Sequence, residues 1–580
     1  MQNTFVQLAK NCKKDMSSFP VYKIAMLGDC SMEHLATAIK GHAYDFNLAL
    51  EILDTGYNNI LPCIMQADSN MYKFSPNAVL IYMCVEQLYI VWCATPENER
   101  ITFAVSNFNN IQTIWAHISS QCVANIIQFT FAEYDDAVFG NRGCVQPEAF
   151  VYQLRKLNML LIEGGPSYKN VFLVDLFGIQ SRIGRDAMHD SKLYLASKIP
   201  IAISALPIIA SSVVSILLAL NGRVNKCIVL DLDNTIWGGV IGDDGLSGIE
   251  IGELGIGQAF SSLQLWLKEL KNRGVLLAVC SKNNEDIAKK AFEKHNDMIL
   301  ALDDFAVFTA NWEDKVTNIK RIQQTLNIGM DSIVFIDDSP FERSLVRSFL
   351  PDIIVPELPD DPAEYLNYLK KLNLFETISF SNEDKKRTEQ YRAEAGRELL
   401  RIEYTDYDEY LKELKMTSCA LPFDEYHVPR IAQLTQRSNQ FNLRTVRYTE
   451  SDIDIIKNDT ELITFYFMLK DKLMDYGLVS VVILKNHGDG ILFIDTWLMS
   501  CRVLKRGMEE FVINKVFETA KHHKYKKVVG EYIETQKNTM VKNIYEDLGF
   551  IRKKNNFFTA NVAEYKYNKT FIKEYQNEEE

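Results

Sequence analysis

The chain has 580 residues, of which 47% are hydrophobic and 24% charged, and its formal net charge is −13. This composition is ordinary for a globular protein, and the acidic balance disfavours nucleic acid as a partner. At about 150 residues per domain, the length predicts roughly three or four domains, each large enough to bury its own core.

The 11 cysteines are scattered along the chain, without a CxxC pair and without a secretory signal at the N-terminus. This usage is typical of a reducing compartment, so we expect a cytoplasmic protein without disulfides.

Residues 1–222 are predicted to form a first α/β domain. Apolar runs at 22–27, 78–83, 101–105 and 171–176 alternate with helix-like stretches, which is the pattern of a parallel α/β sheet.

An uncharged stretch at 199–222 is long enough to cross a membrane. Pro200, Pro207 and four serines between Ser204 and Ser215 interrupt it. About fifteen residues of helix remain after Pro207, which favours a buried core helix and no membrane contact.

Residues 223–375 are predicted to form a second α/β domain. Its expected strands are 226–231, 275–280, 306–309 and 333–336, and its expected helices are 258–272, 285–293 and 314–326. Gly274 and Gly329 stand where helix C-caps are expected.

Residues 376–580 are predicted to form a third domain of α+β type, which opens with a charged run at 384–401. We expect strands near 478–484, 491–497 and 527–532, helices near 509–521 and 539–548, and a solvated tail at 577–580.

Two aspartates stand at the exit of the first strand of the second domain, in the sequence Val229-Leu230-Asp231-Leu232-Asp233. Open α/β sheets hold their sites at such strand ends. Paired acids repel each other unless a cation or a shared proton separates them. The pair therefore predicts a metal and a phosphate.

Further polar residues follow the other three strands of this domain. They are Ser281, Lys315, Asp337 and Asp338. A parallel sheet brings all of them to one carboxyl edge. There one carboxylate can attack phosphorus and a second can transfer protons, while the hydroxyl and the ammonium hold phosphoryl oxygens and the last two acids hold Mg²⁺.

This order of motifs resembles the haloacid dehalogenase (HAD) superfamily. The resemblance implies that Asp231 is the nucleophile and Asp233 the general acid/base and a main-chain carbonyl ligand of Mg²⁺. It implies in the same way that Ser281 and Lys315 bind the phosphoryl group and that Asp337 and Asp338 bind the metal. Helix-capping acids would explain one such motif, but not four in order.

Only about fifty residues separate Asp231 from Ser281, and about thirty-four separate Ser281 from Lys315. One helix and one strand use most of each interval, so we expect no large cap domain and an open site.

Longer stretches resemble a narrower family. They are 231–245, 278–284, 335–340, 433–442 and 500–504. Together they identify the chain as a member of the FkbH-like family (HAD subfamily IIIC), which joins an N-terminal SGNH-like domain, a HAD-like domain without a large cap and a GNAT-like C-terminal domain.

The FkbH-like resemblance implies a reaction. Such proteins take a phosphoglyceryl unit from 1,3-bisphosphoglycerate, hold it as a thioester, remove its phosphate and deliver glycerate to the phosphopantetheine arm of an acyl carrier protein. The products enter polyketide, related secondary-metabolite or polysaccharide biosynthesis.

This chemistry needs a thiolate, and two cysteines are candidates for it. Cys280 precedes the phosphate-binding Ser281, and Cys501 lies in the loop after a predicted strand of the third domain. Each is equally compatible with a small buried core residue, so the choice stays open.

The loop around Arg502, Arg506 and Gly507 precedes a predicted helix whose N-terminus could bind a pantetheine phosphate. The GNAT fingerprint Arg/Gln-x-x-Gly-x-Gly/Ala has Lys505 at its first glycine, which hinders close approach to acetyl-CoA.

The first domain contains Gly28-Asp29-Cys30-Ser31 and Asp186-Ala187-Met188-His189. These resemble SGNH hydrolase blocks, but Cys30 replaces the serine, so a docking scaffold is favoured over an esterase.

Two other functions remain. A plain HAD phosphatase for a small phosphorylated metabolite or sugar would need neither a carrier nor a cysteine. A GNAT acetyltransferase or binding scaffold with a vestigial HAD domain is disfavoured by the intact acids.

Overall fold

The computed structural model describes residues 3–380, 388, 406–438, 440–472, 474–535 and 537–575. They form two compact units, Met1–Leu218 and Ala219–Glu580, with the division inside helix α11 (Leu206–Leu220). The charged run at 384–401, apart from Thr388, the tail at 577–580 and Asn439 of the 433–442 stretch lie outside the described residues.

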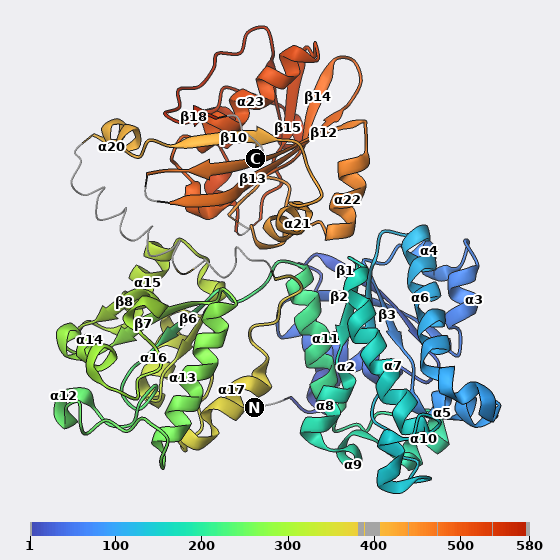
Figure 1. The fold of residues 1–580 in the computed structure, drawn as a ribbon. Helices are drawn as coiled ribbons and strands as arrows, with labels where there is room; N and C mark the ends of the chain where they lie inside the picture. Colours follow the sequence, from blue (N-terminus) through green and yellow to red (C-terminus); the bar gives the residue numbers. More distant parts are fainter. Residues whose placement is uncertain are drawn as a thin grey trace. The chain divides into compact units, whose positions relative to one another are not determined.

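The first unit is built on a parallel five-stranded sheet with the order β2-β1-β3-β4-β5 (Figure 1). The strands are β1 (Val21–Gly28), β2 (Ala49–Tyr57), β3 (Ala78–Tyr82), β4 (Asn125–Phe129) and β5 (Val171–Val174). Ile24 and Met26 are as fully buried as Ala25 and Leu27 between them, because helices cover both faces of the sheet.

The helices of this unit are short except for α6, α7 and α11. They are α1 (Phe5–Asn11), α2 (Glu33–Tyr44), α3 (Ile60–Met65), α4 (Asn70–Phe74), α5 (Val85–Ala94), η1 (Glu97–Thr102), α6 (Phe103–Gln121), η2 (Gly140–Val145), α7 (Phe150–Gly164), η3 (Gly165–Ser167), α8 (Leu176–Ile183), α9 (Arg185–Met188) and α10 (Ser191–Ser197). The helix expected after Pro207 is α11, which has 15 residues.

One predicted strand of this unit is wrong. Residues 101–105 lie in η1 and the first turn of α6, where Phe103, Ala104, Phe108 and Ile111 are buried at helical spacing. The apolar run is too short to show whether its residues have the spacing of a helix or that of a strand. The strand of this region is β4, twenty residues further along.

The second unit begins with a parallel four-stranded sheet of order β8-β7-β6-β9. Its strands are β6 (Cys227–Leu230), β7 (Leu276–Ser281), β8 (Phe305–Ala310) and β9 (Ile333–Ile336), which confirms the four predicted strands to within one residue at each end. The helices are α12 (Ile241–Asp244), α13 (Gly257–Asn272), α14 (Glu285–Lys294), η4 (Leu302–Asp304), α15 (Lys315–Leu326), η5 (Met330–Ser332), α16 (Pro340–Phe349), η6 (Pro362–Glu364) and α17 (Tyr365–Leu372).

Of the two predicted C-cap glycines, one fits and one does not. Gly274 follows the C-cap of α13 with φ +94°, which favours glycine. Helix α15 instead ends at Asn327, which adopts the left-handed conformation with φ 46°, while Gly329 is extended. Asparagine tolerates this conformation better than other side chains, so it can end a helix without glycine.

The unit ends with a mixed sheet whose main path is β16-β17-β15-β14-β13-β12-β10-β18, with β11 paired to β14 (Figure 1). Its strands are β10 (Thr417–Leu421), β11 (Phe441–Asn442), β12 (Leu462–Lys470), β13 (Asp475–Asn486), β14 (Ile491–Met499), β15 (Lys527–Glu531), β16 (Ile551–Arg552), β17 (Phe557–Asn561) and β18 (Lys573–Glu574). The helices are α20 (Tyr407–Glu413), α21 (Val428–Arg437), α22 (Glu450–Asn458), η7 (Cys501–Val503), α23 (Met508–His522), η8 (Thr539–Val541), α24 (Ile544–Asp547) and η9 (Lys554–Asn556). The single helix predicted at 539–548 is therefore two short ones.

Strands β14 and β15 are parallel, and the last residues that pair between them are Ile494 and Gly530. Beyond this point β11 pairs with β14, and the main-chain N–H of Ile533 donates to the carbonyl of Leu443 over 2.8 Å. The chain's own residues 441–443 thus occupy the space between the two separating strands.

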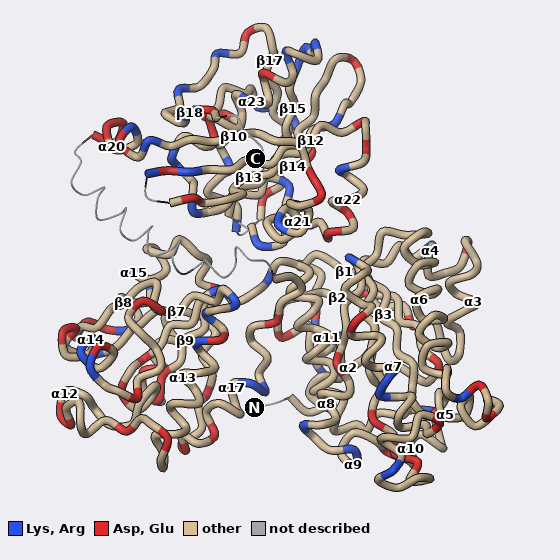
Figure 2. The backbone as a smooth tube through the Cα atoms, viewed as in Figure 1, with Lys and Arg blue, Asp and Glu red and all other residues tan. Residues whose placement is uncertain are grey.

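Figure 2 shows that acidic and basic residues are interspersed along the backbone of both units. Among the described residues, no helix is both long and apolar enough to span a membrane.

Candidate functional site

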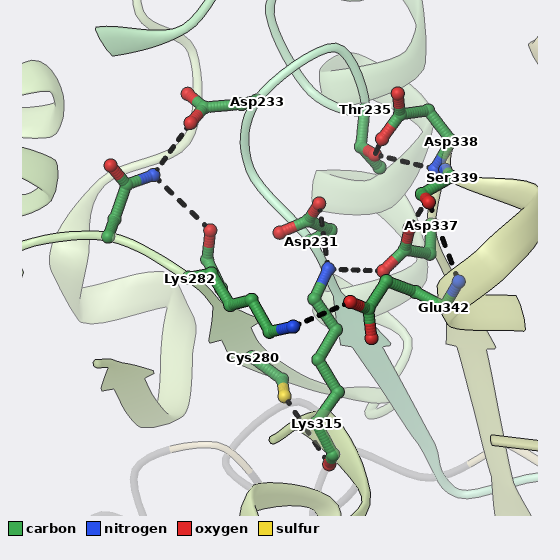
Figure 3. A network of polar contacts seen from close by, with 12 residues as sticks. Asp231, Asp233, Thr235, Cys280, Lys282, Lys315, Asp337, Asp338, Ser339 and Glu342 are labelled. Carbon is green, nitrogen blue, oxygen red and sulfur yellow. Dashed lines mark hydrogen bonds and ion pairs between the residues drawn. The ribbon is translucent and has the colours of Figure 1, made fainter. Parts of the chain in front are cut away.

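Four strand ends of the four-stranded sheet carry the acids and their partners (Figure 3). Asp231 follows β6, Ser281 ends β7, Lys315 begins α15 after β8, and Asp337 and Asp338 follow β9. All four strands run parallel, so these residues meet at one edge, as the sequence predicts.

Lys315 lies at the centre of this edge and is only 2% exposed. Its Nζ is 2.9 Å from Oδ2 of Asp231 and also forms an ion pair with Asp337. Burial alone would lower the pKa of Lys315, but the charges of Asp231 and Asp337 outweigh it and hold this pKa above its usual value. The lysine is therefore a fixed cation.

Three carboxylates converge beside this lysine. One oxygen each of Asp231, Asp337 and Asp338 lies within 4.8 Å of the other two. Burial, followed by the charge of Asp231, raises the pKa of Asp337 to about 6 and raises that of Asp338 as well. One ammonium does not neutralise three acids, and an all-oxygen donor set of this kind fits Mg²⁺.

The carboxylate of Asp233 lies outside this group and is held by three donors. Its Oδ1 accepts hydrogen bonds from Trp237 Nε1 (2.9 Å) and the N–H of Ile241 (3.0 Å), and its Oδ2 accepts one from Asn283 Nδ2 (2.8 Å). The metal role that the HAD resemblance gives Asp233 concerns its main-chain carbonyl. The three donors fix the orientation of its carboxylate.

Three residues of this site were not predicted from the sequence. Asn283 is 3% exposed and also donates to Ser281 Oγ over 3.3 Å, so it links the Asp233 carboxylate to the Ser281 hydroxyl. The hydroxyl of Thr235 accepts from the N–H of Asp338 over 3.1 Å. Arg343 donates to the carbonyls of Asp337 (2.9 Å) and Asp338 (2.6 Å).

The mouth of the site has no large cap. Between β6 and α13 the chain forms only α12 and two isolated bridges, Asp233 to Trp237 and Gly238 to Glu250. Trp312, in the loop after β8, is 77% exposed, and Phe341, in the first turn of α16 after β9, is 70% exposed. Two large exposed apolar residues therefore follow the same strand ends as Lys315 and Asp337.

The two candidate cysteines differ sharply in environment. Cys280 is fully buried, its Sγ donates to the carbonyl of Lys315 over 3.8 Å, and burial raises its pKa to about 12. It packs in the apolar core with Ile319 and Ile322 of α15. Cys501 is partly exposed and lines a cavity.

The three residues expected to bind pantetheine, in the loop before α23, have different partners. Arg506 donates to the hydroxyl of Tyr476, Arg502 Nε donates to Ser500 Oγ over 3.1 Å, and Gly507 is the N-cap with φ 83°. The carboxylate of Glu509 accepts from the N–H of Lys505 over 2.7 Å. The chain's own acid thus occupies this helix N-terminus.

In the first unit the two SGNH-like blocks meet where the strand order reverses between β1 and β3. The N–H of Cys84 donates to Asp29 over 2.8 Å, and His189 Nδ1 lies 3.0 Å from Glu86 Oε1. Cys30 is 2% exposed, and the hollows here are only about 20 and 10 Å³, enough for about one water each.

Comparison with known proteins agrees with this geometry. Residues 23–218 match the family model described as FkbH, N-terminal domain. The N-terminal part of the protein BF1531 from Bacteroides fragilis, which contains a phosphatase domain complexed with Mg, is 44% identical. That match covers 65% of this chain and 100% of the other, with a TM-score of 0.63. The chain belongs to the FkbH-like family.

Two further matches to this FkbH-like chain are weak. The ribosomal-protein-S18-alanine N-acetyltransferase from Escherichia coli is 10% identical over 25% of this chain and 94% of its own, with a TM-score of 0.20. The spermidine N-acetyltransferase from Vibrio cholerae, in complex with CoA and spermine, is 13% identical over 26% and 98%, with a TM-score of 0.21. No curated protein matches.

Glu509 makes stability depend on pH. Burial raises its pKa from 4.5 to about 7, and its Oε2 has no partner among the described residues. The folded state therefore binds this proton more tightly than the unfolded state does, and the charged carboxylate destabilises the fold increasingly as pH rises from 4.5 to about 7.

We expect Glu509→Gln to raise the thermal midpoint by about 2–4 °C near pH 8, with the gain vanishing near pH 4. Scanning calorimetry at the two pH values measures it, and Glu546→Gln, at an exposed position, is the control. An equal gain at both pH values would contradict the assignment to this ionisation.

Proposed function

We propose that this chain is a Mg²⁺-dependent HAD-type phosphatase that removes phosphate from a phosphorylated three-carbon acyl unit. The observation that carries the proposal is the buried Lys315 between Asp231 and Asp337, beside a third acid, Asp338. In this proposal residues 223–375 form the phosphatase domain, and 1–222 and 376–580 are flanking domains that select the substrate.

Each residue has a definite task in this reaction. The Asp231 carboxylate attacks phosphorus and forms an aspartyl-phosphate as the alcohol leaves, and Asp233 donates the proton to that alcohol. Asp233 then accepts a proton from the water that cleaves the acyl-phosphate bond. Ser281 Oγ and Lys315 Nζ hold the phosphoryl oxygens.

The metal would be held by the carboxylates of Asp231, Asp337 and Asp338 and by the main-chain carbonyl of Asp233. Bound there, Mg²⁺ supplies positive charge to the phosphoryl oxygens and lowers the repulsion among the acids. Arg343 and Thr235 keep the two metal acids in place through the main chain and the side chain of that segment.

Replacing the nucleophile should stop the reaction. Asp231→Asn keeps the shape but removes the attacking charge, so we expect phosphate release to fall by about a thousandfold or more. A colorimetric phosphate assay with Mg²⁺ measures it, and Asp243→Asn, at an exposed acid of α12, should behave as wild type. Release by Asp231→Asn at the wild-type rate would remove the mechanism.

The substrate is proposed to arrive on a carrier. An open site flanked by Trp312 and Phe341 suits a group tethered to a protein, because no part of the 233–256 segment forms an enclosing cap. We propose a phosphoglyceryl unit derived from 1,3-bisphosphoglycerate, handed to the phosphopantetheine arm of an acyl carrier protein. Secondary-metabolite or polysaccharide biosynthesis would consume the product.

If the carrier docks at this mouth, Trp312→Ala should raise KM for the carrier-bound substrate about tenfold, because exposed aromatic side chains often dominate such contacts. The KM for a small phosphorylated substrate should stay within about twofold. Steady-state kinetics with both substrates tests this, and Tyr426→Ala, at an exposed aromatic distant in sequence, is the control. Equal changes for both substrates would argue against docking here.

The transfer also needs a thiol, and Cys501 is proposed as that thiol in preference to Cys280. Cys280 is enclosed by core side chains and its pKa of about 12 keeps it protonated. Cys501 is partly exposed and lines a cavity, so a ligand that enters this cavity can reach it.

Intact-mass analysis after incubation with 1,3-bisphosphoglycerate, Mg²⁺ and a pantetheinylated carrier tests this role. We expect a glyceryl adduct on the carrier with wild type and with Cys93→Ala, at an exposed cysteine, and a loss of about a hundredfold with Cys501→Ala. Free phosphate alone, formed at a rate indifferent to the carrier and to both Cys280→Ala and Cys501→Ala, would leave a plain phosphatase.

A further inference from the structure

A cavity of about 360 Å³ lies in the second unit, between the segment that precedes β9 and the loop that follows β14. Its volume is within the range of small-molecule sites, roughly 300–1,000 Å³. It is far larger than the hollows of about 20 and 10 Å³ in the first unit.

The lining of this cavity is positively charged in a chain whose net charge is −13. Its basic side chains are Lys226, Arg430, Arg437, Arg502 and Lys537. Its acidic side chains are Asp331, which pairs with Lys537, and Asp352. The excess of basic groups favours an anion.

Arg502 provides a second, independent observation. The residue is 8% exposed, and its Nη1 is buried without a hydrogen-bond partner among the described residues. Arg502 also lines the cavity, and a buried guanidinium nitrogen without an acceptor is costly, so a ligand that brings an acceptor next to it would lower this cost. A guanidinium group can donate two parallel hydrogen bonds to two oxygens of one phosphate.

Cys501 precedes Arg502 and lines the same cavity. Asn327 Nδ2 donates to its carbonyl over 2.8 Å, and Lys226 Nζ donates to the carbonyl of Arg437 over 3.0 Å. These contacts hold the two walls of the cavity together. Cys501 and Arg502 are neighbours in the chain and both line the cavity, so an anion at Arg502 would lie close to Cys501.

The cavity is separate from the phosphoryl site. Lys226 precedes β6, whereas Asp231 follows it, and the five residue steps from one to the other span about 16 Å at roughly 3.3 Å per residue. The two places lie at opposite edges of the same sheet.

We propose that this cavity is a second ligand site, which binds a phosphate-bearing group on a short chain through Arg502 next to the Cys501 thiol. The phosphate can belong to a small phosphorylated metabolite or to a phosphopantetheine arm, because both present the same oxygens. The site shares Cys501 with the proposed transfer but does not require phosphatase activity.

The test measures how fast iodoacetamide alkylates each cysteine of the full chain, with peptide mass spectrometry, without Mg²⁺ and at constant ionic strength. The probes are inorganic phosphate, 3-phosphoglycerate and 4′-phosphopantetheine. Glycerate and pantetheine are the matched probes without phosphate. The exposed Cys93 and Cys144 are internal references in the same chain.

We expect the phosphorylated probes to slow alkylation of Cys501 at least about fivefold and to leave Cys93 and Cys144 unchanged. Whichever of 3-phosphoglycerate and 4′-phosphopantetheine protects at the lower concentration identifies the source of the phosphate. The protection should be lost in Arg502→Met and kept in Lys505→Met, which removes an exposed cation of the same loop outside the cavity.

Three results would overturn the proposal: Cys501 reacts at the same rate with and without phosphate, it slows only in parallel with Cys93 and Cys144, or protection persists in Arg502→Met. The wild-type comparison stands even if Arg502→Met does not fold. Because Mg²⁺ is absent and no turnover is measured, failure here is distinct from failure of the phosphatase mechanism.

Discussion

The buried ion pairs of Lys315 are the interaction on which the second unit depends. A lysine that is 2% exposed needs compensating charge, and Asp231 and Asp337 provide it from the ends of two adjacent strands. The same contact makes both acids tolerable in a buried position. Removing either partner would leave the others as uncompensated charges, so the strand ends and the site stabilise each other.

The rest of the site is arranged around this group by the main chain. Arg343 contacts the carbonyls of Asp337 and Asp338 and also pairs with Glu357, and Thr235 joins the β6 loop to the β9 loop. These bonds involve the main-chain carbonyls of Asp337 and Asp338 and the main-chain N–H of Asp338, which are not among the proposed ligands of the phosphate or the metal. The main chain of both acids is therefore held in place by contacts other than the ion pairs of Lys315.

Much of this architecture could be predicted from the sequence, since β6 and β9 are short apolar runs that end in acids. Asn283 was not predicted because its role depends on contacts with Asp233, fifty residues earlier, although its place two residues after Ser281 was a signal. The cavity at Arg502 could not be predicted, because its walls come from segments far apart in the chain, such as those of Asn327 and Cys501, which are 174 residues apart. The false strand at 101–105 shows that a run of five residues, four of them apolar, is too short to distinguish a strand from a helix.

The positions of β11 and Glu509 have a consequence for the last domain. Residues 441–443 occupy the space between β14 and β15, and the Glu509 carboxylate occupies the N-terminus of α23. Both places are therefore filled by the chain itself. The cavity at Arg502 has walls from two sheets, because Asn327 and Lys226 of the four-stranded sheet's domain contact Cys501 and Arg437 across it, so a shift of one wall would change the space that the other encloses.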